Sequence, residues 1–237
     1  MLPQLFRPTT ASVAAVTLGR LNLEYPARGL CSVAFWFRFS HWCKCHPIPR
    51  LPDGKYGKGR SWLWDLVIQS EGLDKLPVKY LEFGVYRGES IAWWLNRLPH
   101  PDSRFVGFDT FTGLPERWRR SEGLGHFNTN GKVPDIKDPR CSFLAGLFQD
   151  TLPTFIEQND LSGRLILQMD ADLYTSTLYV LTRLAPYLKS GDILFFDEFS
   201  CPQDEFRAFH EFVRTYRLKY EFMGAVYGYT RVCIKLL

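Results

Sequence analysis

Residues 81–90 read LEFGVYRGES and place a glycine-rich turn between two predicted elements. The run 78–83, VKYLEF, predicts a strand, while the stretch 90–98 predicts a helix. Between them, Gly84 and Gly88 let the backbone approach a ligand closely, and the start of the helix favours negative groups. A strand, a glycine turn and a helix in this order therefore predict a ligand site at the end of a sheet strand.

The same alternation of strands and helices continues to the end of the chain. We predict strands at 104–108, 142–145, 165–169 and 193–196, and helices at 62–71, 177–188 and 204–217. Two further runs, 220–226 and 230–236, read as a hairpin. The expected fold class is α/β: a Rossmann-like, seven-stranded, mostly parallel sheet with a C-terminal antiparallel hairpin and helices on both faces. Helical pieces near 9–20 and 30–42 form a predicted helical N-terminal extension.

Composition excludes several classes of protein. The 237 residues are 46% hydrophobic and 23% charged, which is typical of a globular chain. The net charge of +4 is too small for an obligate nucleic-acid binder, and no apolar run predicts a membrane span. The six cysteines include no CxxC pair, and we interpret the cluster HWCKCH at 41–46 as free thiols and loop histidines. These features favour a reducing, cytoplasmic location.

The basic residues are unevenly distributed. Residues 1–50 hold six basic residues against one acidic residue, whereas the remainder holds 23 against 24. We therefore divide the chain into a basic, aromatic cap or lid at 1–60 and a catalytic domain at 61–237. We expect acceptor specificity and the contacts of a homodimer or higher homo-oligomer in the cap. A transit peptide is the alternative interpretation of this segment.

An acidic residue follows the glycine turn at the distance expected for a nucleotide-binding fold. Asp109 ends the second predicted strand, where a carboxylate would accept hydrogen bonds from ribose hydroxyls. The fingerprint GxGxxG is absent because Tyr86 stands at its middle glycine. Alone, Glu82 could be a loop carboxylate and Asp109 a helix N-cap. Together they point to an adenosine-containing cofactor.

Four motifs carry a resemblance to a known family. Residues 81–90 resemble motif I of class I S-adenosylmethionine-dependent methyltransferases, and more distantly the cation-dependent catechol O-methyltransferase. Three further stretches are similar to the macrocin O-methyltransferase group, which modifies macrolide sugars: GFDTFTGLPE at 107–116, GLFQDTLP at 146–153 and DADLYTST at 170–177. The resemblance covers about 78–237.

The resemblance implies roles for the cofactor-binding residues. Glu82 and the backbone around Gly84 would hold the methionine amino end, and Ser90 would meet its carboxylate. Tyr86 would lie near the sulfonium and Asp109 would bind the ribose. Phe148 and Gln149 would flank the adenine, although core packing is an alternative for Phe148.

Four acids follow the fourth and fifth predicted strands: Asp170, Asp172, Asp197 and Glu198. Crowded carboxylates repel one another unless a cation joins them or they take up protons, and Mg²⁺ prefers oxygen ligands. The resemblance implies that Asp170, Asp197 and Glu198 bind the metal. Glu198 departs from the family, where Asp or Asn is usual. The alternative is that these acids are N-caps or surface charges with no metal.

The general base is less clearly marked. Catechol-type enzymes carry a lysine where this chain has Leu173, so we consider Asp172 and His126. His126 lies in a glycine-rich stretch of the long connection 111–138, which reads as a lid. An exposed loop histidine is the alternative for His126.

The expected function is Mg²⁺-dependent O-methylation of a small polyhydroxylated natural product, such as a sugar. A nicotinamide oxidoreductase is an alternative, disfavoured by the missing fingerprint and by the terminal hairpin. A methyltransferase-like binding protein that has lost the chemistry is a second alternative. The partner is then a small-molecule acceptor and not a nucleic acid.

Overall fold

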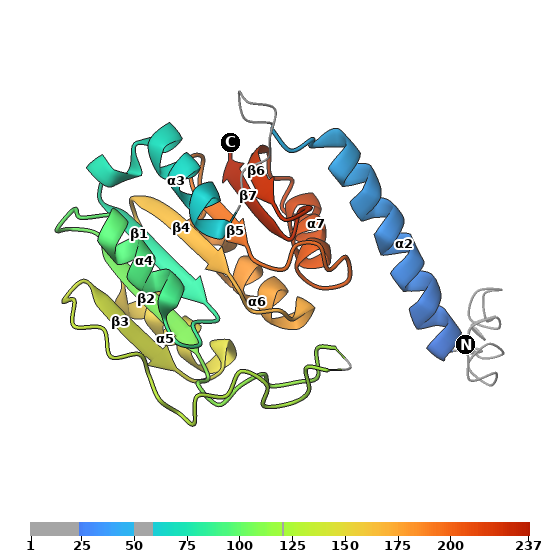
Figure 1. Cartoon of the computed structure of the whole chain (residues 1–237), viewed down its shortest axis with the longest axis horizontal. Coiled ribbons are helices and arrows are strands. Elements are labelled where there is room, and N and C mark those ends of the chain that lie inside the picture. The colour runs from blue at the N-terminus through green and yellow to red at the C-terminus, as the bar shows by residue number, and fades with distance from the viewer. Residues whose placement is uncertain (1–23, 50–58, 120) are drawn as a thin grey trace, which may run out of the picture.

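Seven strands form one sheet in the computed structural model, which describes residues 24–49, 59–119 and 121–237 (Figure 1). The order across the sheet is β3-β2-β1-β4-β5-β7-β6. The five parallel strands are β1 (Val78–Phe83), β2 (Arg104–Asp109), β3 (Cys141–Ala145), β4 (Arg164–Met169) and β5 (Ile193–Phe196). The antiparallel hairpin consists of β6 (Tyr220–Val226) and β7 (Arg231–Leu236), and β7 pairs with β5. The predicted fold class is confirmed.

Helices cover both faces of the sheet because side chains alternate along each buried strand. Leu81 and Phe83 of β1 face a core that they share with α5 (Phe148–Gln158), α6 (Tyr174–Leu184) and α7 (Glu205–Thr215). Tyr80 faces the opposite core, which is covered by α3 (Arg60–Glu71) and α4 (Glu89–Arg97). Short 3₁₀ turns at Leu73–Lys75 and Ala185–Tyr187 complete the connections.

The N-terminal extension contains one long described helix, α2 (Glu24–Cys45), which runs beside α7 and the hairpin (Figure 1). Its buried side chains Phe35, Phe39 and Trp42 belong to the same core as α7. Trp42 donates a hydrogen bond through Nε1 to the Tyr220 hydroxyl at 2.9 Å. The helix predicted at 30–42 is therefore confirmed and is longer than expected, whereas the piece near 9–20 lies outside the described residues.

One helix, α5, is absent from the predicted elements. It contains Pro153 in its interior, where the missing N–H removes a helical hydrogen bond and obscures the helical pattern in the sequence. The helix predicted at 177–188 begins earlier, at Tyr174, and ends at Leu184. No helix in the described ranges is both long and apolar enough to cross a membrane.

Candidate active site

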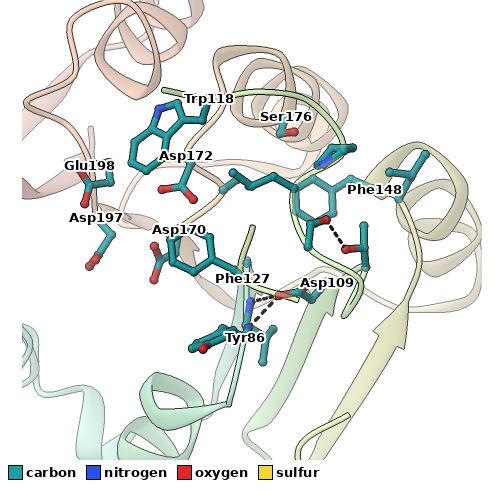
Figure 2. Close-up of a pocket in the computed structure, with 18 of the residues that line it drawn as sticks. Tyr86, Asp109, Trp118, Phe127, Phe148, Asp170, Asp172, Ser176, Asp197 and Glu198 are labelled. Atoms are coloured by element: carbon teal, nitrogen blue, oxygen red, sulfur yellow. Dashed lines mark hydrogen bonds between the residues drawn. The ribbon is translucent and has the colours of Figure 1, made fainter. Parts of the chain in front are cut away.

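A cavity of about 510 Å³ opens at the carboxyl ends of β1, β2, β4 and β5 (Figure 2). This is the edge where open parallel sheets bind ligands. One part of its lining comes from the glycine turn and Asp109, and the other part comes from the acids after β4 and β5. Ten of the predicted site residues line this cavity: Gly84, Tyr86, Ser90, Asp109, Phe148, Gln149, Asp170, Asp172, Asp197 and Glu198.

Asp109 holds the glycine turn in place. Its Oδ2 accepts hydrogen bonds from the backbone N–H groups of Val85 and Tyr86, both at 2.8 Å (Figure 2), and its Oδ1 accepts one from Phe111 at 2.7 Å. Tyr86 has a φ of 52°, a strained value for a residue other than glycine. With two lone pairs on each carboxylate oxygen, Oδ2 is fully used by these contacts, whereas Oδ1 keeps one acceptor site. Asp109 can therefore fix the turn and still accept a hydrogen bond from a ligand.

Gly84 is required because the turn passes very close to β4. It has a φ of +95°, and a Cβ at this position would lie 1.9 Å from the carbonyl oxygen of Asp170. Gly88, in contrast, does not line the cavity. A Cβ on Gly88 would lie 2.9 Å from Pro134, so this glycine makes room for the connection between β2 and β3.

Glu82 on β1 has no exposed surface and is not among the residues that line the cavity. Its Oε2 accepts a hydrogen bond from the Tyr80 hydroxyl at 3.1 Å, and its Oε1 has no hydrogen-bond partner in the described part of the chain. Burial raises the pKa of Glu82 to about 8. A cationic group close to Glu82 would favour its ionised form. Ser90, which is also buried, lies in the first turn of α4 on the same side of the sheet.

Helix α5 begins with Phe148 and Gln149, and both residues line the cavity. The Phe148 ring packs edge-on against Phe83, with ring centroids 5.4 Å apart. Phe148 therefore contributes to the core and to the cavity wall together.

Carboxyl groups gather at the other part of the cavity. Figure 2 shows Asp170, Asp172, Asp197 and Glu198 on one side of it, and the fully buried Glu205 lies behind them. Burial raises the pKa of Asp170 well above its usual range, and the charges of Asp197 and Asp172 raise it further. Burial and the neighbouring Glu198 raise the pKa of Asp172 to about 7. The cavity therefore favours the binding of positive charge.

Three arginines partly neutralise these acids. Arg231 donates to both oxygens of Asp197, with Nε and Nη2 each at 2.9 Å. Arg119 donates to Glu198 at 3.1 Å. Arg60 lies 3.7 Å from Asp170 and 3.8 Å from Asp197. No three acidic, histidine or cysteine side chains of the described residues converge as a metal-binding group.

The connection between β2 and β3 lies over the cavity and is attached at several points. Trp118 lines the cavity and donates through Nε1 to Asp204 at 3.1 Å, and the Arg119 guanidinium stacks 3.6 Å from its ring centroid. Thr175 donates to Glu116 at 2.5 Å. Phe127 approaches Tyr86 with ring centroids 5.7 Å apart. Trp118 therefore forms an aromatic wall beside the acids, and Phe127 forms one beside Tyr86.

The two predicted bases occupy different positions. Asp172 is 6% exposed, has a φ of 60° and directs its carboxylate into the cavity beside Trp118 (Figure 2). His126 is exposed in the connection and does not line the cavity.

Sequence reasoning missed some residues of the cavity. Arg60 comes from the first turn of α3, which lies before every recognisable motif, so no spacing pattern indicates it. Thr175 and Ser176 lie within the stretch 170–177, and only their place after β4 could have suggested a role.

The sheet order, the terminal hairpin and the cavity define a Rossmann-like methyltransferase fold. Two solved structures share this fold. They are the calicheamicin methyltransferase CalS11 (TM-score 0.56, 23% identity, 86% of this chain and 91% of that chain) and the O-methyltransferase NovP (TM-score 0.54, 23% identity, 73% and 78%).

Residues 49–225 match the family Macrocin-O-methyltransferase (TylF), and the chain belongs to that family. Among curated proteins it is 39% identical to the demethyldecarbamoylnovobiocin O-methyltransferase of Streptomyces niveus, over 57% of this chain and 60% of that protein. It is 30% identical to an 8-demethyl-8-(2,3-dimethoxy-alpha-L-rhamnosyl)-tetracenomycin-C 4'-O-methyltransferase of Streptomyces olivaceus, over 54% and 55%. The matches therefore span less than two thirds of these relatives.

Proposed function

We propose that this chain is an S-adenosylmethionine-dependent O-methyltransferase that methylates a hydroxyl group of a sugar on a small natural product. The observation that carries the proposal is one cavity that joins the glycine turn and Asp109 to the carboxylate of Asp172. Family membership supports the reaction, and the rhamnosyl group in the printed name of the Streptomyces olivaceus relative supports a sugar acceptor.

In this proposal the cofactor lies between α4 and α5. Glu82 and Ser90 bind its methionine end, with the helix N-terminus favouring the carboxylate. Asp109 accepts hydrogen bonds from the ribose hydroxyls, while Phe148 and Gln149 enclose the adenine. The bound cofactor would supply the methyl group for transfer to the acceptor.

Methyl transfer from a sulfonium is an in-line displacement, so the acceptor oxygen must be held ~3–3.5 Å from the methyl carbon. We assign Trp118 and Phe127 to enclosing the acceptor, and Asp172 to accepting the proton from its hydroxyl. His126, the other base considered from the sequence, is exposed and does not line the cavity, so its role stays a prediction of the sequence.

The proposal includes a divalent cation. The carboxyl oxygens of Asp170, Asp197 and Glu198 are of the type that Mg²⁺ prefers, and the surplus of acids over arginines suits a cation. A bound Mg²⁺ would lower the pKa of the acceptor hydroxyl. Cytoplasmic location, homo-oligomeric assembly and the domain division at residue 60 stay predictions of the sequence.

Cofactor binding is tested with S-adenosylhomocysteine as the probe. We expect it to raise the melting temperature of the full chain by several degrees, because a ligand that binds the folded state stabilises it. Asp109→Ala should abolish the shift, since it removes both the turn contacts and the ribose acceptor. Asp102→Ala, an exposed aspartate just before β2, is the control and should keep the shift. An unchanged melting temperature of the wild-type chain would contradict the proposal.

A further inference from the structure

Arg60 lies between two of the acids that we assign to the cation. Its Nη1 is 3.7 Å from Oδ2 of Asp170 and 3.8 Å from Oδ2 of Asp197, so one nitrogen faces both carboxylates almost equally. The side chain lines the cavity and is 30% exposed. A cation shared by these two acids would lie in the space that this guanidinium faces.

Arg60 is held less firmly than the other arginine on the same acid. Distances of 3.7 and 3.8 Å are too long for hydrogen bonds, so its attraction to the two carboxylates is electrostatic. Its guanidinium also lies 5.1 Å from the centroid of the Trp64 ring, one turn further along α3. Arg231, in contrast, makes two hydrogen bonds of 2.9 Å to Asp197. Of the two, Arg60 is the one that can leave without breaking a hydrogen bond to Asp197.

We propose that Arg60 is an exchangeable counter-ion of the Asp170–Asp197 pair and competes with a divalent cation for it. The inference rests on the cation site of the proposed function. Without a cation, Arg60 offsets the repulsion between the two carboxylates. A divalent ion bound by both of them brings two positive charges close to the guanidinium, and Arg60 must then withdraw towards Trp64 and solvent.

This competition predicts that a neutral residue at position 60 increases cation affinity. Mn²⁺ serves as the probe, and the electron paramagnetic resonance signal of free Mn²⁺ measures its binding to the full chain without cofactor. We expect Arg60→Met to tighten Mn²⁺ binding by about tenfold, the scale of one charged interaction. Arg60→Lys, which retains the charge, should stay close to the wild type.

The chain offers a matched control in Arg97. This arginine also pairs with an aspartate, Asp65 at 3.0 Å, and also stacks on a tryptophan, Trp93 at 5.1 Å, but it does not line the cavity. Arg97→Met should leave Mn²⁺ affinity unchanged. Asp170→Asn in the Arg60→Met background should remove the gained affinity, and tight binding that survives it would place the ion elsewhere and overturn the proposal.

The remaining outcomes separate this proposal from the proposed function. Equal or weaker Mn²⁺ binding by Arg60→Met overturns the competition. Loss of the S-adenosylhomocysteine shift in Arg60→Met with unchanged Mn²⁺ binding also overturns it, because Arg60 would then serve the cofactor. If no variant binds Mn²⁺ while S-adenosylhomocysteine still stabilises the chain, the counter-ion role and the cation site both fail, and the cofactor assignment stands.

Discussion

Glu82 is an acid in a position that disfavours its charge. It has no exposed surface, and one of its oxygens has no hydrogen-bond partner in the described ranges. Burial disfavours the ionised carboxylate and raises the pKa of Glu82 to about 8, against the opposing effects of hydrogen bonds from Ser90 and Tyr80 and of the charge on Arg60. We interpret this unfavourable environment as preparation for a cation, the amino group of the bound cofactor.

The raised pKa gives a prediction for proton release. At pH 7 Glu82 is protonated in the ligand-free chain, and a bound ammonium group would ionise it, so S-adenosylhomocysteine should release close to one proton on binding. As the pH rises through about 8 the free group ionises, so the release should fall to about half there and vanish only at well above that pH. Calorimetry in buffers of different ionisation enthalpy measures the proton count. Glu82→Gln should release none at pH 7, whereas the exposed control Glu157→Gln should behave as the wild type.

The turn after β1 requires a glycine at position 84. A Cβ at this position would overlap the carbonyl oxygen of Asp170 at 1.9 Å, and the φ of +95° is unfavourable for any other residue. We expect Gly84→Ala to lower the free energy of unfolding by roughly 3 kcal/mol or more, because the backbones of β1 and β4 must separate. Gly123→Ala is the matched control, since a Cβ there meets nothing within 4 Å. Urea unfolding measures both, and equal stabilities would contradict this account of the turn.

The elements that position the cavity differ in how far the sequence predicts them. Residues 165–167 of β4 and 193–196 of β5 are short apolar runs, which predict buried parallel strands. The acids that follow these two strands meet at one edge because parallel strands end there together. Helix α5 is missed because Pro153 interrupts its pattern. Arg60 is missed because its neighbours Asp170 and Asp197 are more than a hundred residues away in sequence, and only the folded sheet brings them together.

At the scale of the molecule, the question is whether the N-terminal extension is a separate cap. The N-terminal segment is rich in aromatic residues, and in α2 their side chains are divided between two faces of the helix. Phe35, Phe39 and Trp42 are buried in the core of the sheet domain, whereas Trp36 and Phe37 are 54% and 73% exposed. One face of the helix is therefore part of the domain core.

Because one tryptophan of α2 is buried and the other is exposed, replacing each should have a different effect on the free energy of unfolding. Trp42 is 6% exposed, lies with its ring centroid 5.0 Å from that of Phe199 and bonds to Tyr220, so Trp42→Ala leaves a large cavity beside α7 and the hairpin. We expect it to lower the free energy of unfolding by about 3–5 kcal/mol, the usual loss for a buried aromatic residue. Trp36→Ala should change it by less than about 0.5 kcal/mol, as for an exposed position.

Urea unfolding followed by circular dichroism measures both variants. If α2 instead unfolded independently of the sheet, Trp42→Ala would leave the main transition unchanged, because the energy of that contact would be lost in a separate, earlier step.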